Sequence, residues 1–283
     1  MKSLIALTGF AAYCGFSYAT RGITEIPKIH NLADGSDKKD SKTLKLMSLN
    51  IAHGRGTSIN HQLFMKRKKL KYNLDKISTV LQRERPHFCA LQESDARTFY
   101  SNELHQSRYL AEKSNISSCI QGRHVNGMNF IYGTALLADK KIQDPLSIAF
   151  DFKPPNPTKG VVIANTEFAG QSIDIVSIHL DFMRNKLRIS QIETLMNILN
   201  ERKNPPLIMG DFNSEWSDKC TMKLLCEELK LKTWEPKKKL STFPKLKKRL
   251  DWILIPKDFN FSSFKVLNDK LSDHQPIVAE ISL

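Results

Sequence analysis

Short apolar runs separated by polar turn residues dominate the chain, and only two segments repeat their apolar residues at helical spacing. Steps of three and four predict one amphipathic helix over residues 69 to about 85, ending before a proline, and another around 187–199. Each helix is followed almost at once by a strand-like run, 87–92 after the first and 207–209 after the second. Strands should therefore dominate the fold.

Several of the strand-like runs are apolar on both faces, so their strands must be covered on both sides. Two stacked β-sheets with helices outside them meet this requirement. We expect one large domain, because two-layer β architectures reach this size as a single unit and no linker interrupts the chain. The remaining runs occupy residues 43–51, 133–138, 160–165, 173–180, 250–255 and 276–281.

The N-terminus differs from the rest of the chain. Lys2 precedes an apolar stretch that ends near Tyr18, with small residues at signal-cleavage spacing. We predict that residues 1–20 are a secretory leader and that the protein is exported, either periplasmic or secreted. An uncleaved membrane anchor and a buried helix are the alternatives. Residues 21–42 should form a polar tether, and residues 43–283 the folded domain.

Composition limits the chemistry only loosely. The five cysteines are too widely spaced for a structural zinc site or a dense disulfide framework. The formal charge of +14 favours a polyanionic partner, either nucleic acid or an acidic membrane surface. Excess lysine also keeps proteins soluble, so the charge by itself names no substrate.

Polar and ionisable residues interrupt the apolar pattern at the ends of strands. One such residue usually caps a turn or satisfies backbone groups. Together they supply carboxylates, carboxamides and imidazoles at the edges of several strands, as metal-assisted attack on phosphorus requires. The segments are Ser48-Leu49-Asn50, Leu91-Gln92-Glu93, Ile178-His179-Leu180-Asp181, Met209-Gly210-Asp211-Phe212-Asn213, Leu250-Asp251-Trp252 and Ser272-Asp273-His274-Gln275-Pro276.

In this order and at these intervals, the segments resemble the signature of the endonuclease/exonuclease/phosphatase family. Most of the resemblance is carried by Gly210-Asp211-Phe212-Asn213 and Ser272-Asp273-His274, within a match from about Lys45 to Ser282. The resemblance implies an α+β fold, a four-layer αββα sandwich with the site at one end of two packed mixed sheets. It also implies a metal-dependent hydrolase of phosphate esters, which we expect to be a monomer.

The resemblance assigns metal ligands and a cofactor. Glu93 is identified as the principal carboxylate, with Asn50 and Asp273 as neighbouring oxygen ligands. Ligation by oxygen alone suits Mg²⁺ or Mn²⁺.

The catalytic roles are carried over in the same way. His274 is similar to the family histidine that acts as general base or phosphate contact, and Asp251 resembles its carboxylate partner. Asp211 is a second candidate for activating water, so the base stays open. Asn213 is expected to donate to a phosphoryl oxygen. His179 matches a histidine near the leaving group or phosphate, with a structural histidine as the alternative, and Asp181 is a weaker candidate.

The substrate is a phosphate ester whose class stays open. Asp211-Phe212-Asn213 lacks the arginine that shortly follows in inositol phosphatases, and Ser177-Ile178-His179 replaces the tyrosine-bearing segment of abasic endonucleases. Basic stretches at 66–69, 237–239 and 245–249 predict a nucleic-acid track or, alternatively, a solvated face.

We favour a nuclease over a phospholipid or sphingomyelin-type phosphodiesterase or a small-molecule phosphatase. A non-catalytic binding relative is the least favoured, because the whole set of site residues is present. A lipid enzyme should expose an apolar loop, for which 150–152 and 259–264 are the candidates.

Overall fold

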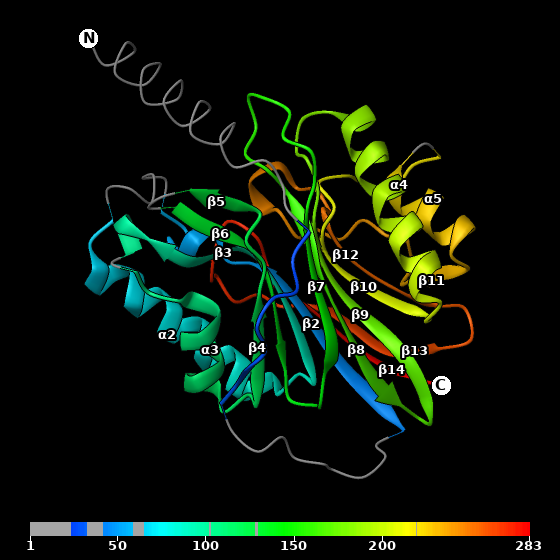
Figure 1. Ribbon diagram of the computed structural model, residues 1–283, viewed down its shortest axis with the longest axis horizontal. Helices are drawn as coiled ribbons and strands as arrows, with labels where there is room; N and C mark the ends of the chain where they lie inside the picture. The colour runs from blue at the N-terminus through cyan, green and yellow to red at the C-terminus, as the bar shows by residue number, and fades with distance from the viewer. Residues whose placement is uncertain (1–23, 33–41, 59–64, 102, 128–129, 219) are drawn as a thin grey trace.

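Two mixed β-sheets pack face to face, and helices cover the outer face of each (Figure 1). The computed structural model describes residues 24–32, 42–58, 65–101, 103–127, 130–218 and 220–283. Helices α2 (Arg67–Glu84) and α3 (Gln106–Ser114) cover one sheet. Helices α4 (Asn185–Arg202) and α5 (Thr221–Glu228) cover the other. The predicted αββα sandwich is confirmed.

Within the described residues the first sheet has eight strands, and β2 and β3 lie near its centre. Neighbours in order are β1 (His30–Asn31), β4 (Ser118–Gln121), β6 (Phe130–Ala138), β3 (Phe88–Thr98), β2 (Thr43–Asn50), β14 (Ile277–Ser282) and β13 (Asn260–Val266), with β5 (Val125–Gly127) pairing to β6.

The second sheet, in the part of the chain that the structure describes, has six strands, and β9 and β10 lie near its centre. Neighbours in order are β11 (Leu231–Thr233), β12 (Asp251–Pro256), β10 (Pro206–Asp211), β9 (Gln171–His179), β8 (Gly160–Phe168) and β7 (Gln143–Ala149). Three short 3₁₀ turns complete the described elements: η1 (Ala52–Gly54), η3 (Phe99–Ser101) and η4 (Pro244–Leu246).

A parallel pair joined through a helix lies in the middle of each sheet. Helix α2 connects β2 to β3, and α4 connects β9 to β10. Parallel strands joined in this way end at the same edge of their sheet. The C-terminal ends of β2 and β3 therefore meet at one edge, and those of β9 and β10 meet at another. The buried apolar side chains between the sheets form a continuous core that fixes how the two edges face each other.

Both predicted helices and all the predicted strands are present, with shifts of a few residues at their ends. Helices α3 and α5 were not predicted. The buried face of α3 includes Gln106, Ser107 and Ser114, so apolar periodicity is weak there. Helix α5 has only eight residues, too few for a clear pattern.

Part of the segment predicted to be a tether packs on the domain. Glu25 forms a β-bridge with Ser147, and β1 extends the first sheet through β4. Ile29 and Leu32 pack against the apolar core, and partial burial of their side chains holds this otherwise polar segment on the domain. The predicted leader, residues 1–20, lies outside the described residues, as do residues 33–41. None of the helices within the described ranges has the length and apolar character needed to span a membrane.

Candidate active site

Strand register brings the polar strand ends together. Asp211 at the end of β10 is paired with His179 across the parallel β9 and with Asp251 across the antiparallel β12. In the other sheet, Asn50 at the end of β2 is paired with Gln92, the residue before Glu93. A hydrogen bond of 3.1 Å from Asn50 Nδ2 to Asp211 Oδ2 joins the two sheets at this end.

Gly210 lets β10 carry Asp211 close to β9. Its φ is 155°, and a Cβ atom at this position would lie 1.9 Å from the carbonyl oxygen of Ile178. No side chain fits at that distance, so any other residue would push the strands apart and move Asp211 away from His179. The glycine that precedes the aspartate is therefore required by the geometry of the sheet.

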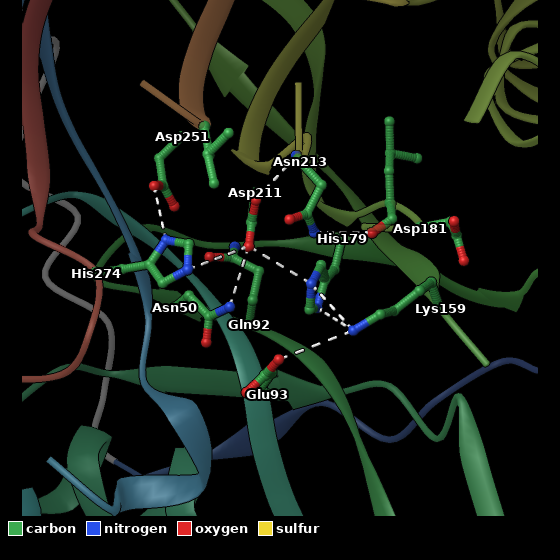
Figure 2. Close-up of polar contacts among 12 residues, drawn as sticks. Asn50, Gln92, Glu93, Lys159, His179, Asp181, Asp211, Asn213, Asp251 and His274 are labelled. Atoms are coloured by element: carbon green, nitrogen blue, oxygen red, sulfur yellow. Dashed lines mark hydrogen bonds and ion pairs between the residues drawn. The ribbon is translucent and has the colours of Figure 1, made fainter. Parts of the chain in front are cut away.

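A continuous line of polar contacts runs across the site, and Figure 2 shows its members. His274 Nδ1 lies 2.9 Å from Asp251 Oδ2, and His274 Nε2 lies 3.7 Å from Asp211 Oδ2. On its other side, Asp211 Oδ2 lies 3.5 Å from His179 Nε2. The line continues from His179 to Lys159 and then to Glu93. We call these residues the polar row: Asp251, His274, Asp211, His179, Lys159 and Glu93.

The charges of His274 and Asp211 follow from their neighbours. Burial opposes protonation of His274, but the carboxylates of Asp251 and Asp211 raise the pKa of its imidazole to about 10. Burial raises the pKa of Asp211 to about 6, against the opposing effect of His274. At neutral pH the centre of the site therefore holds an imidazolium between two carboxylates.

We expect the charge of His274 to stabilise the metal-free fold in a defined pH window. Its folded-state pKa lies above the ordinary value of 6.5, so the contribution is fully present below pH 6.5 and is lost as pH rises through about 10. In chelator, the free energy of unfolding of wild type minus that of His274→Gln should fall by up to about 1.4 kcal/mol per pH unit in this window. Urea unfolding at several pH values measures it, and a pH-independent difference would contradict the assignment.

Lys159 supplies a buried positive charge beside Glu93 and His179. Its ammonium lies 3.1 Å from His179 Nε2 and 3.8 Å from Glu93 Oε1. Burial lowers the pKa of Lys159, while the carboxylates of Glu93 and Asp211 oppose this effect. Burial and the charge of Lys159 hold the pKa of His179 well below its ordinary value, so its imidazole is neutral at pH 7. A neutral imidazole fits a positioning or hydrogen-bonding role better than an acid role.

Glu93 and Asn50 fit a hard divalent cation. Burial would raise the pKa of Glu93, but Lys159 and His53 hold it well below the ordinary range, so the carboxylate is ionised. The Glu93 carboxylate lies 3.8 Å from the Lys159 ammonium and 3.8 Å from His53 Nε2, and both distances are longer than a hydrogen bond. Asn50 Oδ1 accepts from the backbone N–H of Ala52, which leaves its second lone pair. A carboxylate and an amide oxygen on adjacent strands are suitable ligands for Mg²⁺ or Mn²⁺.

A second place for a cation lies within the polar row. The ligand atoms of Asp211, Asp251 and His274 all lie within 4.8 Å of one another, so this group can also hold a metal ion. The carboxylates of this group are already engaged, because Asp211 accepts hydrogen bonds from Asn50 and from the backbone N–H of Asn213, and Asp251 holds Nδ1 of His274. We therefore favour Glu93 and Asn50 as the metal ligands.

The other predicted site residues lie at the same end of the sandwich, in different settings. Asp273 Oδ2 is paired with Arg55, so ligation by Asp273 would require it to share that oxygen or use the other one. Asn213 donates from Nδ2 to the carbonyl of Leu180 and has one further amide hydrogen for a ligand. Asp181, the weakest candidate, holds the turn before α4, because Oδ1 accepts from the backbone N–H groups of Met183 and Arg184. That setting explains Asp181 as a structural residue.

Three residues of the site were not predicted: Lys159, His53 and Asp95. Lys159 precedes Gly160 at the start of a strand and gives no signal in a lysine-rich chain. His53 and Asp95 form a buried pair, with Nδ1 and Oδ1 2.7 Å apart. Burial opposes protonation of His53, but Asp95 and Glu93 raise its pKa. Two features of the sequence could have indicated this pair. His53-Gly54 closely follows the first strand-like run, and Asp95 stands two residues after Glu93.

Comparison with known proteins places the chain among phosphoesterases. A sequence model of the Endonuclease/Exonuclease/phosphatase family matches residues 47–274. No match was found among curated protein sequences. Solved structures with similar folds come from several organisms, and at these sequence identities the likeness shows the fold alone.

Three of the similar structures illustrate the range. An endonuclease/exonuclease/phosphatase family protein from Leptotrichia buccalis is 18% identical, with a TM-score of 0.64, over 85% of this chain and 100% of that one. A mannosyl-6-phosphatase from Bacteroides thetaiotaomicron is 18% identical, with a TM-score of 0.62, over 85% of this chain and 100% of that one. The human Nocturnin catalytic domain with bound sulfate is 16% identical, with a TM-score of 0.60, over 90% of this chain and 96% of that one.

Proposed function

The chain belongs to the endonuclease/exonuclease/phosphatase family, and on that premise we propose that this phosphoester hydrolase cleaves phosphodiester bonds with the help of Mg²⁺ or Mn²⁺. We favour nucleic acid as its substrate. The observation that carries the chemistry is the buried Asp211 carboxylate, which contacts Asn50, His179 and His274 at the end of the two sheets. This arrangement combines a base, an acid and neighbouring metal ligands within one small space.

The charges of Asp211 and His274 indicate a different catalytic role for each residue. An imidazolium cannot accept a proton, so His274 is the hydrogen-bond donor that stabilises the charge developing on the phosphoryl oxygens. Asp211 is ionised at neutral pH and accepts the proton of the attacking water. The base left open by the sequence is therefore Asp211 in this proposal. A divalent ion held by Glu93 and Asn50 supplies Lewis-acid polarisation of the phosphate when it is bound.

The case for nucleic acid rests on the segment between β11 and β12, residues 234–250, which we call the lysine loop. Its exposed lysines are Lys237, Lys238, Lys239, Lys245, Lys247 and Lys248. The loop leads directly into Asp251, and its Phe243 ring contacts His274 with ring centroids 4.8 Å apart. Exposed cations fixed beside the scissile position suit a polymer of phosphates, because each contact adds affinity without reading sequence.

Arg249 does not belong to this exposed surface, which corrects the prediction for the stretch 245–249. Its guanidinium lies 3.9 Å from the ring centroid of Trp252 and donates to the carbonyls of Trp234 and Glu235. Burial lowers its pKa to about 10. Stacking and carbonyl contacts hold the base of the lysine loop in place, so Arg249 anchors the loop and leaves phosphate contacts to the lysines.

A lipid phosphodiesterase is the second candidate. The predicted apolar loops give it little support, since Phe150 and Phe259 are buried, Phe152 is only partly exposed, and Phe261 and Phe264 pack on the core. Two other exposed residues do. Phe182 and Met183 are 53% and 60% exposed, just beyond His179 on the turn after β9. Exposed apolar side chains next to a site are what an enzyme at a lipid surface needs.

We expect the triple variant Lys245→Gln, Lys247→Gln, Lys248→Gln to bind DNA more weakly, with a flatter salt dependence. Each lost phosphate contact should reduce the slope of log affinity against log salt by roughly one. Hydrolysis of a small soluble phosphodiester should change little, because the substituted side chains lie outside the polar row. Fluorescence anisotropy over a salt series measures the binding.

Variants and substrates separate the candidates. Lys113→Gln, Lys141→Gln, Lys203→Gln, at three exposed lysines outside all of the predicted basic stretches, remove the same charge and should leave DNA affinity higher than the loop variant does. Turnover by wild type is compared on plasmid DNA, RNA, sphingomyelin vesicles and a panel of phosphomonoesters. Unchanged DNA affinity in the loop variant, together with lost turnover on vesicles in Phe182→Ser, would favour the lipid enzyme.

A further inference from the structure

A second histidine–carboxylate pair lies on the other side of Glu93 from Lys159. His53 Nδ1 is 2.7 Å from Asp95 Oδ1, and His53 Nε2 is 3.8 Å from Glu93 Oε2. The pair repeats the arrangement of Asp251 and His274, in which the carboxylate holds Nδ1 and the opposite nitrogen faces the site. His274 faces Asp211, the proposed base, whereas His53 faces Glu93, the carboxylate proposed to bind the metal.

Buried contacts fix the orientation of the His53 ring. Gln106 Nε2 donates to the carbonyl of His53 at 2.9 Å and to Asp95 Oδ2 at 3.1 Å, and Gln106 Oε1 accepts from the Asp95 backbone N–H at 3.0 Å. The Tyr132 ring packs edge-on against the imidazole, with centroids 4.8 Å apart. A helix residue, a strand residue and the turn after β2 thus hold one imidazole in one direction.

The backbone on both sides of this contact adopts conformations that L-residues rarely adopt. Ala52 and His53 have φ values of 47° and 55°, and Glu93 has a φ of 53°. Each such residue costs on the order of 1 kcal/mol or more, and such residues persist where the surrounding structure determines them. The strain falls on the residues that bring His53 Nε2 and Glu93 Oε2 toward each other.

We propose that His53 is a ligand of the divalent metal bound by Glu93 and Asn50, with Asp95 as the carboxylate that orients it. The inference rests on the proposed metal site. A carboxylate that accepts the Nδ1 hydrogen directs the lone pair of Nε2 outward and increases its basicity, as carboxylates do behind metal-bound histidines. Two atoms that share one ion at metal–ligand distances of about 2.1 Å lie roughly 3–4 Å apart, and the His53–Glu93 separation of 3.8 Å falls in that range.

The consequence is a metal preference that oxygen ligands alone would not give. Mg²⁺ prefers oxygen ligands and retains water, whereas Mn²⁺ and Co²⁺ accept imidazole and bind it more tightly along the divalent series. A site with one imidazole should therefore favour Co²⁺ and Mn²⁺ over Mg²⁺. Loss of His53 should reduce this preference.

The test is equilibrium binding of Mg²⁺, Mn²⁺ and Co²⁺ to the full chain by calorimetry, without substrate. We expect His53→Asn to lose about 10–100-fold in Co²⁺ and Mn²⁺ affinity and only a few-fold in Mg²⁺ affinity. Asp95→Asn should lose less metal affinity than His53→Asn, and again more for Co²⁺ and Mn²⁺ than for Mg²⁺. His30→Asn, which removes an imidazole from the edge strand β1, should match wild type.

Two further measurements make the outcome decisive. Wild type loaded with Co²⁺ should show a paramagnetically shifted imidazole N–H resonance in its NMR spectrum. The presence of this resonance is observed in wild type, so it does not depend on the stability of a variant. His53→Asn, which should lack the resonance, assigns it to His53. Absence of that resonance from wild type, or equal loss of all three ions in His53→Asn, would overturn the proposal. Glu93→Gln should weaken all three ions; if it binds them like wild type, the proposed metal site itself is wrong.

Discussion

Replacing His274 by alanine should lower turnover by about 10²–10³-fold at saturating metal and substrate, the range that one preorganised donor to a developing charge contributes. The structure gives the reason, since the imidazolium lies between Asp251 and Asp211 and is almost wholly buried. Its removal would leave two carboxylates without the positive charge between them. Steady-state kinetics on a small phosphodiester measure the loss, which should appear mainly in kcat.

The Asp251 partner supplies a sharper test of the pair. Asp251→Asn should produce part of the loss, because the amide no longer stabilises the imidazolium. The double variant should be little worse than His274→Ala, since groups that act as a unit are strongly non-additive. Asp258→Asn, which changes an exposed carboxylate just beyond β12, is the matched control and should leave kcat unchanged. Additive losses in the double variant would show that the two residues act separately.

Much of this arrangement could be predicted because it depends on local pattern. The helix–strand alternation indicates the two parallel pairs, and strand ends that carry Glu93 and Asp211 follow from apolar runs that stop abruptly. Parallel connections then place such residues at one edge. The fold class and the general position of the site are accessible from the sequence for this reason.

The features that could not be predicted depend on contacts between distant residues. Lysine is common in this chain, and only the approach of Glu93 and His179 distinguishes Lys159 from the solvated lysines. Arg249 lies in a run of exposed lysines, yet stacking on Trp252 buries it. The pairing of His53 with Asp95 depends on Gln106, a helix residue without an apolar pattern around it. Tertiary packing, which a single sequence does not display, decides each of these cases.

The second large expected effect is the loss of turnover when Lys159 is replaced. With nine per cent of its side chain exposed, its ammonium is held in a medium where a charge acts more strongly than in water. It lies between the carboxylate proposed to bind the metal and a neutral histidine of the polar row, so we expect it to contact the phosphoryl group of a bound substrate. Lys159→Met should lower kcat by about 10²–10³-fold, as expected for loss of one preorganised charge contact.

A purely structural role for Lys159 predicts different data. In that case Lys159→Met would change the free energy of unfolding while the affinity for inorganic phosphate, a product mimic, stayed the same. If Lys159 binds the phosphoryl group, phosphate affinity should fall together with kcat, and Lys159→Arg should restore part of both because it keeps the charge but changes its shape. Lys153→Met, at a nearby exposed lysine, controls for net charge. Calorimetric titration with phosphate separates the two roles, because contacts of Lys159 with Glu93 and His179 alone would stabilise the fold without drawing an anion into the site.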